Sequence, residues 1–166
     1  MDFVSIIMGS KSDYEIMKNC ANTLEMFNVK YELIISSAHR SPDRTKRYIK
    51  EAENKGAKVF IAAAGMAAHL AGAIAAGTTK PVIGVPMKGG AMDGMDAMLS
   101  TVQMPSGMPV ATVALGKAGA INAAYLAIQI LAIFDKELAV KLQEDRIIKE
   151  KTVANDSQEI EVLISL

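Results

Sequence analysis

Two histidines, His39 and His69, are the residues of this sequence best suited to carry a proton during a reaction. Imidazole is the side chain whose ordinary pKa lies close to neutrality, so it can act as a general acid or a general base. Each histidine follows a short apolar run that is typical of a β-strand, and its neighbours are small or hydroxyl-bearing. Because ligands of open parallel α/β sheets bind at the carboxyl ends of the strands, this placement predicts a site.

The segment from Gly9 to Asp13 joins the first apolar run to the first expected helix. Its free backbone amides and the hydroxyls of Ser10 and Ser12 form a natural seat for a phosphate, although the segment matches neither a Walker loop nor a GxGxxG fingerprint. Asp13 would repel a phosphate but would accept hydrogen bonds from sugar hydroxyls. The alternative interpretation is that Ser12 or Asp13 only caps the helix.

A second candidate segment, from Ser36 to Pro42, places His39 beside Arg40 after another expected strand. The Arg40 guanidinium can hold a phosphate through two parallel hydrogen bonds. Pro42 suits the first turn of the next helix. Alternatively, both residues are ordinary solvated surface side chains.

A third segment, from Ala63 to Leu70, offers backbone amides at a helix start, where a carboxylate or carbonyl oxygen can bind. His69 can face that pocket. The alternative is a buried histidine that lies one turn into an apolar helix and bonds to a backbone carbonyl.

Several other chemistries are disfavoured because their motifs are missing from the sequence. It contains no paired carboxylates, no HExxH and no Gly-x-Ser-x-Gly, and two histidines are too few for a typical zinc site. We therefore expect neither a metal nor a covalent serine intermediate. A sugar-phosphate cradle, an acid–base histidine and a small amide-lined pocket remain.

The elements that must position these segments are strands alternating with helices, which predicts an α/β fold with one parallel sheet. The length of 166 residues favours a single domain, 1–166, with a core over about 3–134. The expected strands are 3–8, 30–35, 58–63, 81–85 and 110–114, and the expected helices are 13–27, 42–55, 67–76, 92–102, 119–134 and 136–151. The tail 152–166 is left open, because its apolar end from Ile160 can pair as a strand or dock on a neighbour.

Composition limits the partners and the compartment. Equal numbers of acidic and basic residues give no bulk field for nucleic acid or an anionic membrane. The apolar stretches Val59 to Gly77 and Ala118 to Phe134 contain polar residues and fit buried elements better than membrane spans. Cys20 is the only cysteine, which suits a reducing cytosol, and the first residues lack the basic region of a signal peptide. We expect a cytoplasmic protein that binds neither nucleic acid nor membranes.

Several separated motifs together resemble the N5-carboxyaminoimidazole ribonucleotide mutase family of purine biosynthesis, the class I PurE proteins. The resemblance covers about residues 3 to 140 in the family's order. The residues that carry it are Met8–Asp13, Ser37–Arg40, Gly65–Gly72, Pro81–Pro86, Val102–Pro105, Gly116–Ala120 and Asn122–Ala124.

The resemblance implies a flavodoxin-like three-layer αβα sandwich with a five-stranded parallel sheet and a C-terminal helix. It also implies a homo-octamer that needs no cofactor and no metal. The reaction would move a carboxylate from the exocyclic N5 of an aminoimidazole ribonucleotide to ring carbon C4, by release of CO2 into a closed pocket and recapture at C4. His39 would be the general acid and base, and the substrate contacts would come from Ser10, Ser12, Asp13, Ser37, Arg40, Gly65, Ala68 and His69.

The third segment departs from the family pattern, and two other functions are considered. Met66 and Ala71 stand where the family commonly has glycine and proline. A related class carboxylates aminoimidazole ribonucleotide directly with CO2, but it typically carries lysine where this chain has Arg40, and an Arg-Ser-Asn third loop. A flavodoxin-like nucleotide-binding module without catalysis is the other alternative, and such a module has no need of His39.

Overall fold

The computed structural model describes residues 2–164. By internal contacts the chain divides into two units, one ending at Ile130 and one beginning at Leu131. Each unit is described by itself. The last two residues of the apolar tail lie outside the described part.

The first unit is built on five strands that all run parallel, in the spatial order β2-β1-β3-β4-β5. Their bounds are β1 Phe3–Met8, β2 Tyr31–Ile35, β3 Ala57–Ala64, β4 Val82–Pro86 and β5 Ala111–Thr112. Every residue of β1 and β4 is buried, because helices cover both faces of a parallel sheet. The expected five-stranded parallel sheet is confirmed, and β5 is shorter than the expected 110–114.

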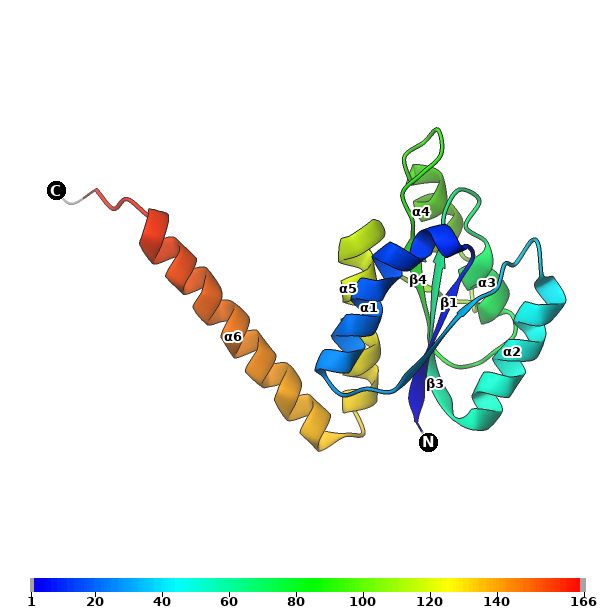
Figure 1. The fold of residues 1–166 in the computed structure, drawn as a ribbon, viewed down its shortest axis with the longest axis horizontal. Helices are drawn as coiled ribbons and strands as arrows, with labels where there is room; N and C mark the ends of the chain where they lie inside the picture. Colours follow the sequence, from blue (N-terminus) through cyan, green and yellow to red (C-terminus); the bar gives the residue numbers. More distant parts are fainter. Residues whose placement is uncertain (1, 165–166) are drawn as a thin grey trace. The chain divides into compact units, whose positions relative to one another are not determined.

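Helices cover the two faces of this sheet, so the unit has three layers (Figure 1). Figure 1 shows α1 and α5 on one face and α2 and α3 on the other. The rings of Phe27 and Tyr125 meet edge to face, with centroids 5.4 Å apart, where α1 and α5 approach each other. Gly84 of β4 leaves room for Ala71 of α3 and Thr101 of α4 on the opposite face. The helices are α1 Tyr14–Met26, α2 Pro42–Lys55, α3 Leu70–Ala75, α4 Met95–Val102 and α5 Gly116–Ala132, with a 3-10 turn η1 at Lys11–Asp13.

The start of α3 differs from the expected one in a way that matters for the site. The helix begins at Leu70 and not near Ala67. Met66 has a left-handed backbone with φ +55°, and the His69 amide donates to the Ala67 carbonyl at 2.8 Å, so the chain turns before the helix can begin. His69 therefore stands at the helix start, and the expectation that it lies one turn inside the helix is wrong.

The second unit contains α6, Lys136–Ile160, which continues nine residues past the expected end at 151. The segment 152–159 has no glycine or proline to stop a helix. Asp135 caps the first turn, as expected, by accepting a hydrogen bond from the Leu138 amide at 3.0 Å. No helix among residues 2–164 is long and apolar enough to cross a membrane.

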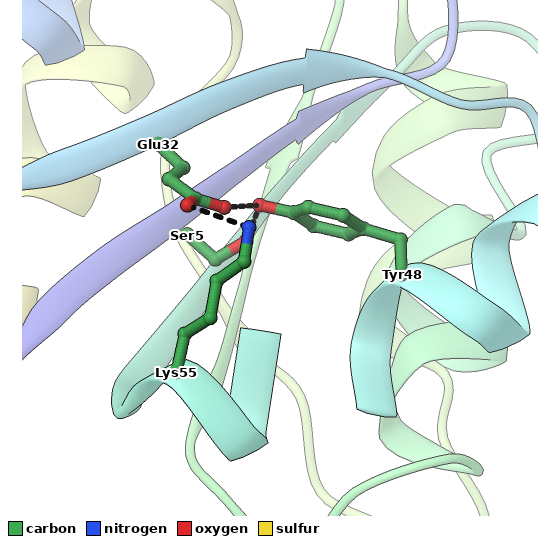
Figure 2. A network of polar contacts seen from close by, with 4 residues as sticks. All are labelled: Ser5, Glu32, Tyr48 and Lys55. Atoms are coloured by element: carbon green, nitrogen blue, oxygen red, sulfur yellow. Dashed lines mark hydrogen bonds and ion pairs between the residues drawn. The ribbon is translucent and has the colours of Figure 1, made fainter. Parts of the chain in front are cut away.

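A polar network of Ser5, Glu32, Tyr48 and Lys55 ties β1, β2 and α2 together (Figure 2). The Tyr48 hydroxyl donates to Glu32 Oε2 at 3.1 Å and lies 2.9 Å from the buried Ser5 hydroxyl. A hydroxyl has one hydrogen, so Ser5 donates to Tyr48. Lys55 binds the other Glu32 oxygen at 3.0 Å. The network thus fixes β2 and α2 relative to each other, and the loop that contains His39 joins these two elements.

Candidate active site

Four loops meet at the carboxyl edge of the sheet and enclose a cleft of about 680 Å³. They follow β1, β2, β3 and β4, so the cleft lies where the strand order reverses around β1, the usual ligand position in such sheets. The lining residues are Gly9, Ser10, Ser12, Asp13, Ser37, Ala38, His39, Arg40, Ala64, Gly65, Met66, Ala67, His69, Leu70, Lys88, Gly89 and Gly90.

In the first loop, the cap of the helical turn is Ser10. Its Oγ accepts from the Ser12 amide at 3.3 Å and from the Ser12 hydroxyl at 2.9 Å. Asp13 precedes α1 without capping it through its side chain. The alternative of a cap made by Ser12 or Asp13 is therefore wrong, and the Asp13 carboxylate stays available to the cleft.

Asp13 is 8% exposed, although it lines the cleft. Burial raises the pKa of its carboxyl, while hydrogen bonds from Ser10 and Ser12 and the charge of Arg40 oppose that rise. Such a carboxylate is oriented by its neighbours and suits recognition of a sugar hydroxyl.

The second loop is held by a cluster of hydroxyls. The buried Ser36 hydroxyl lies 2.7 Å from that of Thr45 in α2, and the Ser41 hydroxyl accepts from the Ser37 amide at 3.0 Å. The Ser41 amide in turn donates to the Ser37 carbonyl at 3.0 Å. These bonds close a tight turn that projects His39 and Arg40 into the cleft.

Arg40 bridges the first two loops. Its Nη2 donates to the Gly9 carbonyl at 2.8 Å, and its backbone amide donates to the Ser37 hydroxyl at 3.1 Å. A guanidinium has five N–H donors, so donors remain for an anion beside the first loop. Arg40 is exposed, as the alternative interpretation expected, but its bond to the Gly9 carbonyl holds the guanidinium at the cleft.

The two histidines are in direct contact. His39 Nε2 lies 2.8 Å from His69 Nδ1, and the two rings meet nearly at right angles, with 83° between their planes. Both side chains are exposed to the cleft, which rules out the buried alternative for His69. The contact orients both imidazoles, and one hydrogen is shared between the two nitrogens.

The third loop brings Gly65 and Ala67 to the cleft wall, but not Ala68. Ala68 is 1% exposed and belongs to the core, whereas its neighbour Ala67 lines the cleft, so the expectation that Ala68 faces the substrate is wrong. The other expected site residues, Ser10, Ser12, Asp13, Ser37, His39, Arg40, Gly65 and His69, all line the cleft.

A fourth loop was missed from the sequence. Lys88, Gly89 and Gly90 follow β4 and line the same cleft. Lys88 adds a positive charge to the cleft wall, and the two glycines add backbone without side chains. The rule that polar and glycine-rich residues after a strand belong to the site would have found them.

A larger hollow of about 890 Å³ lies by the amino ends of β4 and β5. Its charged lining residues are Glu53 and Lys80, and Glu53 already accepts a hydrogen bond from Thr78. This hollow has neither an imidazole nor a guanidinium in its lining, so the smaller cleft is the better candidate for chemistry. Residues 2–164 contain no group of three or more histidine, cysteine or acidic side chains placed to hold a metal ion.

The strand order, the helices on both faces and the cleft at the reversal point define a three-layer, flavodoxin-like α/β protein whose cleft contains two imidazoles and a guanidinium. A family model described as AIR carboxylase matches residues 3–152. AIR denotes aminoimidazole ribonucleotide. The chain belongs to the AIR carboxylase family.

Similar proteins cover almost the whole chain. The N5-carboxyaminoimidazole ribonucleotide mutase of Bacillus subtilis is 54% identical over 95% of this chain and 97% of its own length. The mutase of Pyrococcus horikoshii is 56% identical over 84% of this chain and 78% of its own length. The crystal structure of Treponema denticola PurE is similar with a TM-score of 0.88 and 27% identity, and the match covers 98% of this chain and 100% of that one.

Proposed function

We propose that this protein is an enzyme of purine biosynthesis that converts N5-carboxyaminoimidazole ribonucleotide to 4-carboxy-5-aminoimidazole ribonucleotide, as its mutase relatives are named to do. The single observation that carries the proposal is the imidazole pair His39–His69, held 2.8 Å apart in a cleft that also contains Arg40. The pair supplies acid–base chemistry and the guanidinium supplies an anion site.

In this proposal the ribose phosphate lies on the first two loops. Arg40 and the amides near Ser10 bind the phosphate, while Asp13 and the hydroxyls of Ser12 and Ser37 bind the sugar side of the nucleotide. The position of Arg40, bonded to the Gly9 carbonyl, supports this orientation because it places the cation beside the first loop. The imidazole ring of the nucleotide then reaches toward His39 and Gly65.

The reaction balances with one histidine. The bond between N5 and the carboxylate carbon breaks, its electrons stay on nitrogen, and the nitrogen takes a proton from His39, which leaves AIR and CO2. Ring carbon C4 attacks the CO2 carbon and forms the new C–C bond. His39 then removes the C4 proton and regains the proton that it gave. One imidazole serves as acid and then as base, without a cofactor.

His69 has a supporting role in this scheme. Its Nδ1 contact orients the His39 ring and selects which His39 nitrogen carries the hydrogen. Gly65 and Ala67 wall the space beside the pair with small groups. A confined pocket is what retention of CO2 needs, because a neutral molecule is held by shape and not by charge.

The test compares two variants in the same assay. Offered the N5-carboxy nucleotide, His39→Asn should retain nucleotide affinity and lose about 10²- to 10⁴-fold in kcat, the usual contribution of a general acid–base. Arg40→Ala should weaken nucleotide binding about 10- to 100-fold, with the exposed Arg47→Ala on α2 as the matched control. Near-normal turnover by the His39 variant would refute the assignment.

The same assay separates the alternatives. AIR with bicarbonate or CO2, in place of the N5-carboxy nucleotide, should give the C4-carboxylated product only at high CO2. Efficient carboxylation of AIR at low CO2 would instead indicate the direct carboxylase. Tight nucleotide binding without turnover of either substrate would indicate a binding module.

We also propose that the enzyme is a homo-octamer of the cytoplasm. Exposed apolar side chains on α6, among them Val140, Ile147 and Val153, support assembly because burial between copies would remove them from water. A free, buried Cys20 suits a reducing compartment. Light scattering after size-exclusion chromatography should give eight times the 17.7 kDa chain, and cell fractionation should place the protein with cytoplasmic enzymes.

A further inference from the structure

The fourth loop is fastened to the third loop at the point where both leave the sheet. The Met87 amide donates to the Ala64 carbonyl at 2.9 Å. A Cβ placed on Gly65 would meet both Cβ and the carbonyl oxygen of Met87 at 3.6 Å. Lys88 follows Met87 directly and lines the cleft. The fourth loop therefore brings a lysine to the part of the cleft that Gly65 walls, where the proposed function places the ring of the nucleotide.

Lys88 and Arg40 stand on different sides of the cleft. Arg40 follows β2 and Lys88 follows β4, while β1 and β3 lie between these two strands in the sheet. Because all the strands run parallel, the loops at their carboxyl ends keep the same order. A nucleotide whose phosphate is bound beside Arg40 therefore has its other end on the side of the cleft that holds Lys88.

The positive charge of Lys88 is not offset by a neighbouring carboxylate. Among the described residues 2–164, no carboxylate oxygen lies within 4.0 Å of the Lys88 ammonium. A Cβ placed on Gly116 would lie 4.0 Å from Lys88 Cγ, and the first turn of α5, which begins there, has no acidic residue. By contrast, the charge of Arg40 acts on the Asp13 carboxylate. Of the charged side chains in the cleft lining, Lys88 is thus the one left to attract an anion.

We propose that Lys88 is a specificity-determining residue that binds the carboxylate group of the nucleotide and so makes the cleft prefer the carboxylated nucleotides over AIR. The inference rests on the proposed function. An ammonium is a compact charge on a flexible stem, so it can contact the carboxylate when this group is on N5 and again when it is on C4. The phosphate is common to all three nucleotides, whereas AIR lacks the carboxylate.

The test compares the binding of AIR with that of the C4-carboxylated nucleotide by isothermal titration calorimetry. Both ligands carry the ribose phosphate, so the ratio of their Kd values isolates the carboxylate. Lys88→Met keeps much of the stem and removes the charge, and it should weaken binding of the carboxylated nucleotide about 3- to 10-fold while the Kd of AIR stays the same. Lys88→Arg keeps the charge and should retain the preference.

A lysine outside the cleft provides the matched control. Lys80 lines the larger hollow by the amino ends of β4 and β5. Lys80→Met removes the same charge from the chain and should leave both Kd values unchanged. An equal effect of Lys80→Met and Lys88→Met would refute a local role of Lys88, since the loss would then follow from net charge.

Salt gives a second readout of the same contact. The preference of the wild type for the carboxylated nucleotide should shrink as NaCl is raised from about 50 to about 500 mM, because salt screens an exposed ion pair, while the Kd ratio of Lys88→Met should change little. An unchanged Kd ratio in Lys88→Met would refute the inference. So would an equal loss for both ligands, which would place Lys88 on the phosphate or the sugar. A wild type that binds neither nucleotide would refute the proposed function instead.

Discussion

Tyr48→Phe removes one hydroxyl from the network of Ser5, Glu32, Tyr48 and Lys55 and should destabilise the protein at neutral pH. The lost group accepts from the buried Ser5 hydroxyl and donates to Glu32. A buried hydroxyl left without its partner costs about 1–3 kcal/mol. For a chain of this length, 1 kcal/mol lowers Tm by about 2–4 °C. Thermal or urea unfolding followed by circular dichroism measures the change.

A double-mutant cycle with Ser5→Ala shows whether the pair is the cause. Removing both partners leaves no unsatisfied hydroxyl, so the double variant should be less destabilised than the sum of the single variants, by about 0.5–2 kcal/mol. Strict additivity, or a cost of Tyr48→Phe below about 0.5 kcal/mol, would refute the reasoning.

Alkaline pH gives an independent check on the same residue. Burial and the hydrogen bond to Glu32 raise the pKa of Tyr48 from 10.0 to about 12. Between these values the unfolded state releases the proton first, so the stability that the phenol contributes is complete below pH 10 and is lost as the pH rises toward 12. The advantage of wild type over Tyr48→Phe should narrow by about 1.3 kcal/mol from about pH 9 to about pH 11. A constant difference would contradict the burial argument.

Two further predictions concern the core. Gly119→Ala in α5 should lower the free energy of unfolding by about 3 kcal/mol or more, because the added Cβ would lie 1.7 Å from the Ala114 carbonyl oxygen. Gly72→Ala in α3 is the control, since its nearest added contact is the Met104 sulfur at 3.4 Å, and it should cost less than about 1 kcal/mol. Urea titration measures both changes. The Cys20 thiol is fully buried, and burial raises its pKa to about 12. Iodoacetamide at neutral pH should therefore modify Cys20 only after denaturation, as measured by mass spectrometry. Fast labelling of the native protein would contradict that burial.

The sequence predicted the sheet and most of the cleft because both follow from one rule, that ligands meet parallel strands at their carboxyl ends. That rule places His39, Arg40 and Gly65 correctly. It does not say which of two neighbouring alanines faces the cleft, since this depends on the turn before α3. Alanine is a strong helix former, so the helix propensity of Ala67 and Ala68 predicts a start of α3 that is earlier than the observed start at Leu70. The left-handed Met66 that delays it has no local signal.

The end of α6 and the place of the fourth loop in the cleft were not predicted, for different reasons. Nothing local marks the end of α6, because a helix without glycine or proline ends where side-chain caps and packing decide. Lys88 and the two glycines after it lie between the expected strand 81–85 and the expected helix 92–102, and they follow β4 as the other site loops follow their strands. Glycines carry no side chain that marks a site in the sequence, whereas imidazole and guanidinium groups do.

The His39–His69 contact also has a consequence for folding. His39 follows β2 and His69 follows β3, and β1 pairs with both strands between them. The two imidazoles therefore meet only when the first strand of the chain has been inserted between the second and the third. Such a non-local arrangement forms slowly, because distant segments must close large loops before they pair. The imidazole pair is thus assembled only when β1 lies between β2 and β3.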